Sequence, residues 1–121
     1  MNKGLPQAQD CLFCRIVRGG IPSRKVFENK ELLAFKDINP QAPIHVIIIP
    51  KKHINSLSGI EKKDSALLGR LQLVMPEIAE KLLGKNSSYR IVTNCGEEAG
   101  QSVLHLHYHL LAGRKFTWPP G

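Results

Sequence analysis

Three histidines at alternate positions, His105, His107 and His109, constrain this chain more than any other feature. Side chains alternate between the two faces of a β-strand, so a strand would place all three imidazoles on one face. On a helix, the same spacing would turn His107 away from the other two. We therefore predict a strand over residues 100–111 whose imidazoles form a row, with neighbours about 7 Å apart.

A glycine, a glutamine and a serine lie directly before these histidines, at positions 100–102. They supply a flexible turn, backbone N–H groups and a hydroxyl beside the first imidazole. Such groups can hold an anion next to a nucleophile. A single histidine in a strand is usually an ordinary packed residue, but this combination predicts a functional site.

The chain has 121 residues, of which 42% are hydrophobic, so it is long enough for one core but too short for two. We expect a polar tail over 1–10 and a single domain over 11–121. No apolar run approaches the roughly 20 residues that span a membrane, and the first ten residues lack the apolar region of a signal peptide. We therefore expect a cytoplasmic protein with no membrane partner.

Basic residues outnumber acidic ones, with 17 Lys and Arg against 10 Asp and Glu, and the resulting net charge of +7 favours anionic ligands. These basic residues are scattered along the chain in pairs rather than gathered in one stripe. Nucleic acid is therefore not the expected partner.

Hydrophobic patterning predicts helices and strands along the whole domain. A run of β-branched residues over 44–49 indicates a buried strand, and an apolar stripe of helical period over 63–83 indicates a long helix packed on the core. Ser58 and Glu61 have the spacing of a capping box before this helix, and Gly84 is suited to end it. The shorter predicted elements are a helix over 11–18 and strands over 25–28, 31–36 and 89–94.

The three cysteines are Cys11, Cys14 and Cys95. An odd number without a secretion signal argues for reduced thiols rather than a disulfide framework. Cys11 and Cys14 fit a redox pair, half of a metal site, or an ordinary apolar turn. A redox pair usually follows a strand, and only a polar tail precedes this one. A zinc site would need two more ligands, which the histidines could supply.

Residues 105–111 have the form His-φ-His-φ-His-φ-φ, where φ is apolar, and resemble the histidine triad (HIT) superfamily. The ending Trp118-Pro119-Pro120-Gly121 is similar to that of one branch, the histidine triad nucleotide-binding proteins (HINT). The resemblance implies an α+β fold of the HIT type, an antiparallel sheet of about five strands with one long helix and a short N-terminal helix. It also implies a two-fold homodimer, in which Trp118 of one subunit shapes the site of the other. Further matching segments are 11–17, 34–38, 41–45, 49–54 and 100–102.

The resemblance implies a purine nucleotide-binding hydrolase that needs no cofactor for catalysis. Its substrates would be adenosine or guanosine 5′-monophosphoramidates, with acyl-adenylates as a further class, and cleavage of the P–N bond would release the nucleoside monophosphate. His107 matches the nucleophile, which forms a nucleotidyl-histidine intermediate. His109 and His45 match donors to the phosphate oxygens, Ser102 matches a donor to the leaving nitrogen, and His105 completes the catalytic set.

The resemblance also implies a nucleotide site, whose apolar residues are equally compatible with ordinary core packing. The implied purine pocket is Phe13, Ile16, Phe35 and Ile38. The implied ribose contact is Asp37, and the implied phosphate and leaving-group contacts are Asn94, Gly100, Gln101, Ser102, His107, His109 and Trp118.

Paired cysteines are absent from many HINT relatives, whereas other HIT branches use them to bind structural zinc. The matching set here is Cys11, Cys14, His53 and His105, a donor set suited to tetrahedral zinc. Two buried cysteines without a metal are the alternative. The thiol of Cys95, close to the implied phosphate loop, would make activity sensitive to oxidation.

Three other functions remain open at this point. The same fold supports dinucleotide polyphosphate hydrolases and nucleotidyl transferases. The chain also fits a nucleotide-binding adaptor with little catalysis, or a zinc-dependent interaction or nucleic-acid module.

Overall fold

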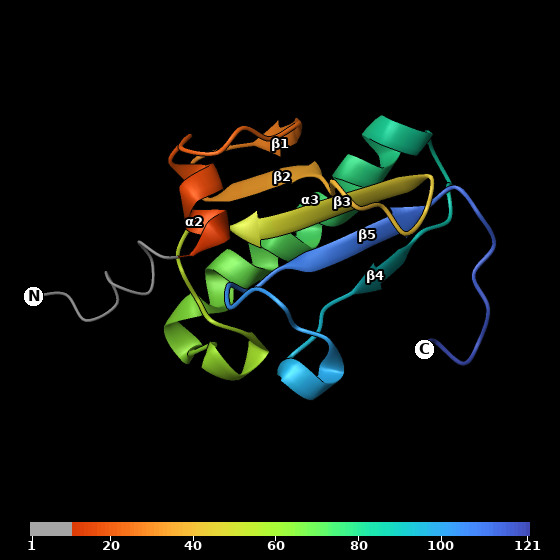
Figure 1. Ribbon diagram of the computed structural model, residues 1–121. Coiled ribbons are helices and arrows are strands. Elements are labelled where there is room, and N and C mark those ends of the chain that lie inside the picture. The colour runs from red at the N-terminus through yellow and green to blue at the C-terminus, as the bar shows by residue number, and fades with distance from the viewer. Residues whose placement is uncertain (1–10) are drawn as a thin grey trace, which may run out of the picture.

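The computed structural model describes residues 11–121, which form one antiparallel sheet with a helix on each face (Figure 1). The strands lie in the order β1-β2-β3-β5-β4, so the central strand β3 pairs with β2 and β5. The elements are α2 (Leu12–Val17), β1 (Lys25–Glu28), β2 (Leu32–Lys36), β3 (Ile44–Pro50), α3 (Ser65–Leu83), β4 (Arg90–Val92) and β5 (Tyr108–Ala112). This confirms the predicted α+β fold with five strands, one long helix and one short helix.

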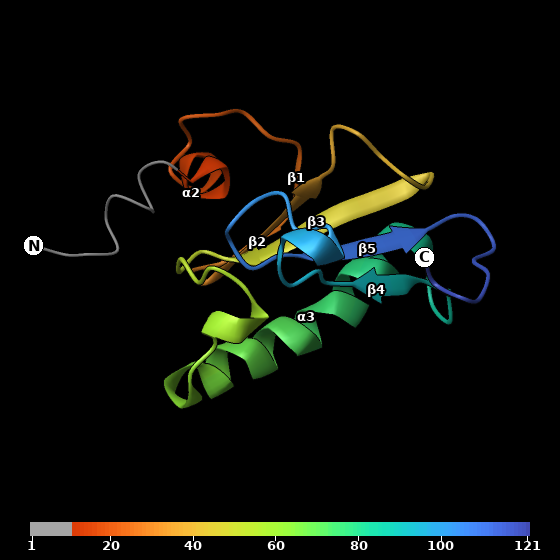
Figure 2. The ribbon, with the colours of Figure 1, turned by 60° about the horizontal axis from the view of Figure 1, so that its bottom comes forward.

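The long helix α3 covers one face of the sheet, as Figure 2 shows. Its apolar stripe, including Leu71 and Ile78, packs on side chains that point from the strands toward it, such as Val46 and Ile48 of β3. The alternation of side chains along β3 explains why every second residue of that strand joins this core. No helix within residues 11–121 is long and apolar enough to cross a membrane.

The opposite face of the sheet carries the short helix α2 (Figure 2). Phe13 and Ile16 of α2 pack on Ile47 and Ile49, the β3 residues that point away from α3. His45 has the same parity along β3 as Ile47 and Ile49, so its imidazole lies on this face. The candidate functional residues therefore gather on the α2 side.

The histidine segment is not a continuous strand, which corrects the prediction for residues 100–111. β5 begins only at Tyr108, so His105 and His107 precede it. The rings of His107 and His109 are 5.1 Å apart between centroids, closer than the predicted row. Strand spacing did not apply because residues 101–107 have no partner strand.

The start of the long helix also differs from its prediction. Ser58 lies within a short 3₁₀ turn, Leu57–Gly59, and does not cap α3. A second 3₁₀ turn, Lys62–Asp64, leads into the helix, and the carboxylate of Asp64 accepts a 3.0 Å hydrogen bond from the backbone N–H of Glu61. The capping interaction therefore lies three residues later than the spacing suggested.

Candidate active site

Two histidines from neighbouring strands meet on the α2 side of the sheet. His45 of β3 stands opposite Leu111 of β5, which places His109 on the adjacent diagonal, and His45 Nε2 lies 2.8 Å from His109 Nδ1. The backbone N–H of Gln41 donates a 3.0 Å hydrogen bond to His45 Nδ1. His45 must therefore carry its proton on Nε2 and donate it to His109 Nδ1, which leaves His109 with an N–H at Nε2.

His107 lies beside this pair with its own tautomer fixed. Its Nδ1 donates a 2.6 Å hydrogen bond to the backbone oxygen of His105, so the lone pair lies on Nε2. The edge of the Phe13 ring packs against the imidazole, with centroids 5.0 Å apart. A histidine held in this way presents one unprotonated nitrogen, the form that acts as a nucleophile.

Burial keeps all three imidazoles neutral at pH 7. It lowers the pKa of His109 to about 4, and it also lowers the pKa of His45 and of His107. The nearby carboxylate of Asp37 opposes each of these shifts without overcoming burial. The site therefore combines a free lone pair on His107 with an N–H donor on His109.

Asp37 lies at the edge of the histidine group. One carboxylate oxygen is 3.3 Å from His45 Nε2, and the other accepts a 2.7 Å hydrogen bond from the backbone N–H of Asn39. Both Asp37 and His45 also line a cavity of about 690 Å³ that extends past Arg24 and Lys36 to the end of the sheet. A carboxylate at the rim of such a cavity can accept hydrogen bonds from ligand hydroxyls.

The residues of the implied purine pocket are not all together. Phe13, Ile16 and Phe35 pack in one buried cluster, and the rings of Phe13 and Phe35 meet edge to face. Ile38 is fully exposed at 100%, on the loop after β2, and is separate from that cluster. Phe13 of this cluster lies against His107, and Ile38 stands at the cavity near Asp37.

The implied phosphate loop has two glycines, Gly96 and Gly100, in a conformation that other residues rarely adopt. Gly100 has a φ of +97°, and a Cβ there would lie 3.6 Å from the side-chain nitrogen of Asn94. The buried side chain of Gln101 donates to the backbone oxygens of Asn55 and Val103, so it braces the loop from inside. Ser102 is exposed at the loop end.

The ring of His105 does not join the other imidazoles but lies in a cluster with Cys11, Cys14 and His53. Its Nδ1 is 3.3 Å from Cys11 Sγ and 3.6 Å from Cys14 Sγ, and Cys14 Sγ is 3.3 Å from His53 Nδ1. All four ligand atoms lie within 4.8 Å of one another. Tetrahedral zinc separates its sulfur and nitrogen ligands by about 3.5 Å, so this cysteine–histidine cluster fits zinc.

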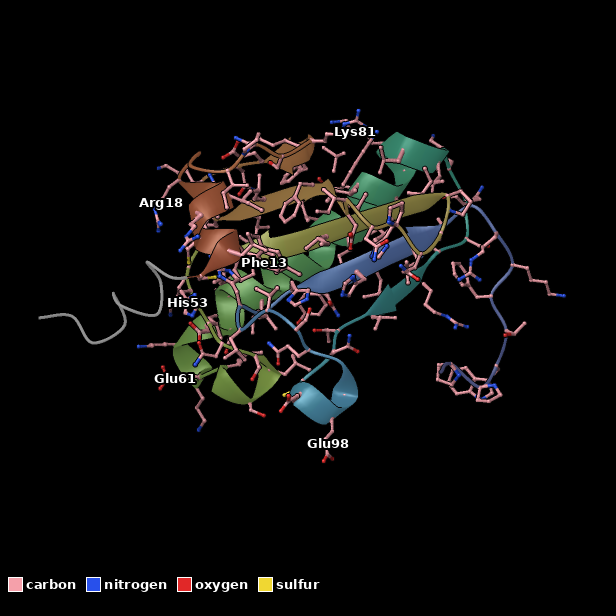
Figure 3. All side chains as sticks on the ribbon, viewed as in Figure 1. Phe13, Arg18, His53, Glu61, Lys81 and Glu98 are labelled. Carbon is pink, nitrogen blue, oxygen red and sulfur yellow. The ribbon has the colours of Figure 1, made fainter. Side chains whose placement is uncertain are left out.

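The outer nitrogens of both cluster histidines have acceptors. His105 Nε2 donates to the backbone oxygen of Pro50 at 2.8 Å, and His53 Nε2 donates to the side-chain oxygen of Asn55 at 2.8 Å. Each Nδ1 is thereby left with its lone pair directed into the cluster, as metal-ligating histidines require. Figure 3 shows His53 and Phe13 at the end of the sheet where α2 lies.

The C-terminal segment extends from β5 along the outside of the domain (Figure 1). The guanidinium groups of Arg90 and Arg114 lie over the Phe116 ring, at 5.1 and 4.3 Å from its centroid. Beyond this anchor, Trp118 is 79% exposed. Its ring is therefore available for contact with another molecule.

Several functional contacts could not be read from motifs. Gln41 contacts His45 through its backbone N–H, which any residue except proline could supply. Pro50 contacts His105 through its backbone oxygen, which any residue could supply. The hydroxyl of Thr93 donates a 2.8 Å hydrogen bond to the backbone oxygen of His107. In the sequence, only the position of Thr93 next to Asn94 indicated a role. The side-chain oxygen of Asn55 accepts a hydrogen bond from His53, two residues earlier in the chain, and this spacing is not part of a typical motif.

Comparisons with known proteins agree with this architecture. The family model described as "Scavenger mRNA decapping enzyme C-term binding" matches residues 10–117. An uncharacterized HIT-like protein from Synechocystis is 51% identical over 114 residues, which cover 94% of this chain and 99% of that protein. Among solved structures, a HIT family hydrolase from Legionella pneumophila has 47% identity and a TM-score of 0.89, with 93% of this chain and 100% of that chain covered. A histidine triad protein from Clostridium difficile has 44% identity and a TM-score of 0.85, covering 89% and 94%. This chain is a member of the histidine triad (HIT) family.

Proposed function

We propose that this chain is a purine nucleotide-binding hydrolase that cleaves the P–N bond of adenosine or guanosine 5′-monophosphoramidates. The observation that carries the proposal is the fixed tautomer of His107, which has its lone pair on Nε2 and whose ring centroid lies 5.1 Å from that of His109. Solved structures described as HIT family hydrolases have the same fold and 42–47% sequence identity. The sequence ending similar to that of the HINT branch favours phosphoramidates among the substrates of this family.

The reaction proceeds in two displacements at phosphorus. In the first, His107 Nε2 attacks the α-phosphorus, a P–N bond to the histidine forms, and the bond to the amine breaks. The leaving nitrogen takes a proton from the Ser102 hydroxyl, which then regains a proton from water. In the second, water attacks phosphorus and gives up a proton to solvent, the P–N bond to His107 breaks, and the nucleoside monophosphate is released. Two displacements replace one difficult hydrolysis.

The remaining histidines would stabilise charge on the phosphate. His109 has an N–H at Nε2 that can donate to a phosphate oxygen, and His45 holds the His109 ring through the 2.8 Å hydrogen bond to its Nδ1. Fixed donors of this kind favour the transition state because they need no reorganisation during the reaction. Asp37 would accept the ribose hydroxyls from the rim of the adjoining cavity.

The test is the release of AMP from adenosine 5′-phosphoramidate by the wild type and by His107→Asn. We expect the variant to lose at least a hundredfold in kcat, roughly 3 kcal/mol of transition-state stabilisation, while it still binds AMP. Equal turnover by the two proteins would remove His107 as the nucleophile. If neither turns over while both bind AMP, the nucleotide-binding adaptor becomes the better account.

A substrate panel separates the proposed activity from the related one on the same fold. A dinucleotide polyphosphate hydrolase would cleave diadenosine polyphosphates faster than the phosphoramidate. We expect the opposite order of kcat/KM, and the reverse result would reassign the substrate while leaving the histidine chemistry unchanged.

The proposal includes zinc in the cysteine–histidine cluster, where Cys11, Cys14, His53 and His105 would hold it. Zinc there would have a structural role, because four protein ligands leave no open position for a substrate. Metal analysis of the purified protein should find about one zinc per chain, and Cys14→Ala should lose it. Wild-type protein purified without chelators and free of zinc would contradict this assignment.

The proposal also includes a homodimer, supported by the 79% exposed Trp118 on an extended C-terminal segment and by the position of β4 at the sheet edge. An edge strand has unpaired backbone groups that can pair with a second copy. Light scattering coupled to gel filtration should give twice the mass of one chain. A monomer at micromolar concentration would contradict it.

A further inference from the structure

His105 takes part in two sites at once, through its ring and through its backbone oxygen. Its ring Nδ1 lies 3.3 Å from Cys11 Sγ and 3.6 Å from Cys14 Sγ, inside the cysteine–histidine cluster. Its oxygen accepts the 2.6 Å hydrogen bond that fixes the tautomer of His107. The residue is completely buried, at 0% exposure, so the two sites share a single well-packed group.

We propose that His105 is a positioning residue, held in place by the cysteine–histidine cluster, that orients the nucleophilic imidazole of His107. The inference rests on the proposed function and extends it, because it gives the cluster a role in the reaction as well as in folding.

Strand pairing does not hold His105. The pairing of β5 with β3 reaches only to Tyr108, and its pairing with β4 only to His109. His105 therefore depends on other contacts. The polar contacts of its ring are the bond from Nε2 to the backbone oxygen of Pro50 and the contacts of Nδ1 with the cluster thiols. Loss of the cluster leaves the ring with one hydrogen bond, at Nε2, and with its packing against Phe13.

The peptide group between His105 and Leu106 links these contacts to the nucleophile. Its N–H donates a 2.6 Å hydrogen bond to the backbone oxygen of Ile54, and its oxygen accepts from His107 Nδ1. A peptide group is planar, so a rotation that disturbs one of these bonds disturbs the other. A shift of the His105 ring would turn this plane and release the His107 tautomer.

The helix α2 provides a second connection. Cys11 precedes this helix and Cys14 lies within it, and Phe13, between them, packs edge-on against the rings of His107 and His105 at 5.0 and 5.9 Å. Six residues are too few to form a stable helix without tertiary contacts. The cluster that holds α2 therefore also holds Phe13 beside the nucleophile.

The experiment compares Cys14→Ala, which breaks the cluster, with Cys95→Ala as a matched control, because the Cys95 thiol contacts Ser58 outside the cluster. Long-range ¹H–¹⁵N NMR spectra distinguish the Nδ1–H and Nε2–H tautomers of His107. We expect one Nδ1–H form in the wild type and in Cys95→Ala, and a mixture of tautomers in Cys14→Ala. The kcat for adenosine 5′-phosphoramidate should fall about 10–100-fold in Cys14→Ala alone.

Backbone amide spectra show whether each variant is folded. His53→Ala replaces Cys14→Ala if the latter does not fold, because His53 is the least buried member of the cluster. A folded cluster variant with a single Nδ1–H tautomer and a wild-type kcat would overturn the inference. If the wild type releases no AMP, the proposed function fails, and the tautomer comparison still decides whether the cluster positions His107.

Discussion

A backbone amide determines which nitrogens of the histidine group carry protons. Because the N–H of Gln41 donates to His45 Nδ1, the proton of His45 must lie on Nε2, and the chain of donors then runs to His109. The motif of alternating histidines identified His107 and His109 correctly as neighbours on one side. The motif gave no information about Gln41, because every residue type except proline has a backbone N–H.

The titration of His109 tests this account at the level of a single residue. Burial lowers its pKa to about 4, and protonation would place N–H groups of His45 and His109 against each other. We expect an NMR titration of His109 to show a midpoint near 4 rather than the usual 6.5. A midpoint above 6 would contradict the assigned tautomers.

The same shift has a consequence for stability. The unfolded chain binds a proton at His109 below about pH 6.5, whereas the folded chain resists it until about pH 4. This histidine's contribution to stability is therefore complete above pH 6.5 and is lost as the pH falls toward 4.

Replacing Asp37 by Asn should lower the midpoint of the His109 titration further, because the Asp37 carboxylate raises the pKa of His109. An unchanged or higher midpoint would show that the carboxylate is too distant to matter.

At the level of elements, the sequence predicted the helix that has a long repeated apolar pattern. It failed for the histidine segment, where a strand also requires a partner strand. The apolar stripe over 63–83 identified α3 to within two residues, since 19 residues of helical period leave little ambiguity. Alternation over 100–111 was less reliable, because any extended segment shows it and a strand also needs a partner. For this reason the ring of His105 joins the cysteine–histidine cluster and not the group formed by His107 and His109.

A glycine at the end of β5 should be sensitive to substitution. Gly113 has a φ of +96°, and an added Cβ would lie 2.8 Å from Cβ of Pro43. We expect Gly113→Ala to lower the free energy of unfolding by about 1–3 kcal/mol, measured by urea denaturation. Gly69→Ala is the matched control, because a Cβ added at Gly69 in α3 would meet no neighbouring atom within 4 Å. This substitution should raise the free energy of unfolding by up to about 1 kcal/mol. Equal effects of the two substitutions would contradict the strain.

Helix α2 should depend on the proposed zinc. Burial, together with Cys11, raises the pKa of Cys14 to about 12, so without a metal this thiol stays protonated at neutral pH. Zinc binding must displace thiol protons, so it strengthens as the pH rises. We expect a chelator to lower Tm, and to lower it more at pH 8 than at pH 6. Cys95→Ser should show the same decrease as the wild type, and a Tm insensitive to chelation would contradict a structural metal.

At the level of the whole molecule, the sheet is closed on one side and open on the other. α3 covers its full length, whereas the six residues of α2 cover only one end of the opposite face, as Figure 2 shows. The part of this face that α2 leaves uncovered contains the buried His45 and the half-buried His109, and the C-terminal segment with the exposed Trp118 runs along the outside of the domain (Figure 1). A second copy of the chain is the partner that the family resemblance implies for this segment.

The mixed dimer tests whether Trp118 acts on the other subunit. One chain carries His107→Asn and the other Trp118→Ala, with different affinity tags so that only the heterodimer is isolated. If Trp118 acts across the interface, the intact His107 is completed by the intact Trp118 of the partner subunit. The heterodimer should then show roughly half the wild-type kcat and a wild-type KM for phosphoramidates with bulky amines, since one of its two equivalent sites is complete. If Trp118 acts within its own subunit, neither site is complete, and the heterodimer should match the Trp118→Ala homodimer in KM.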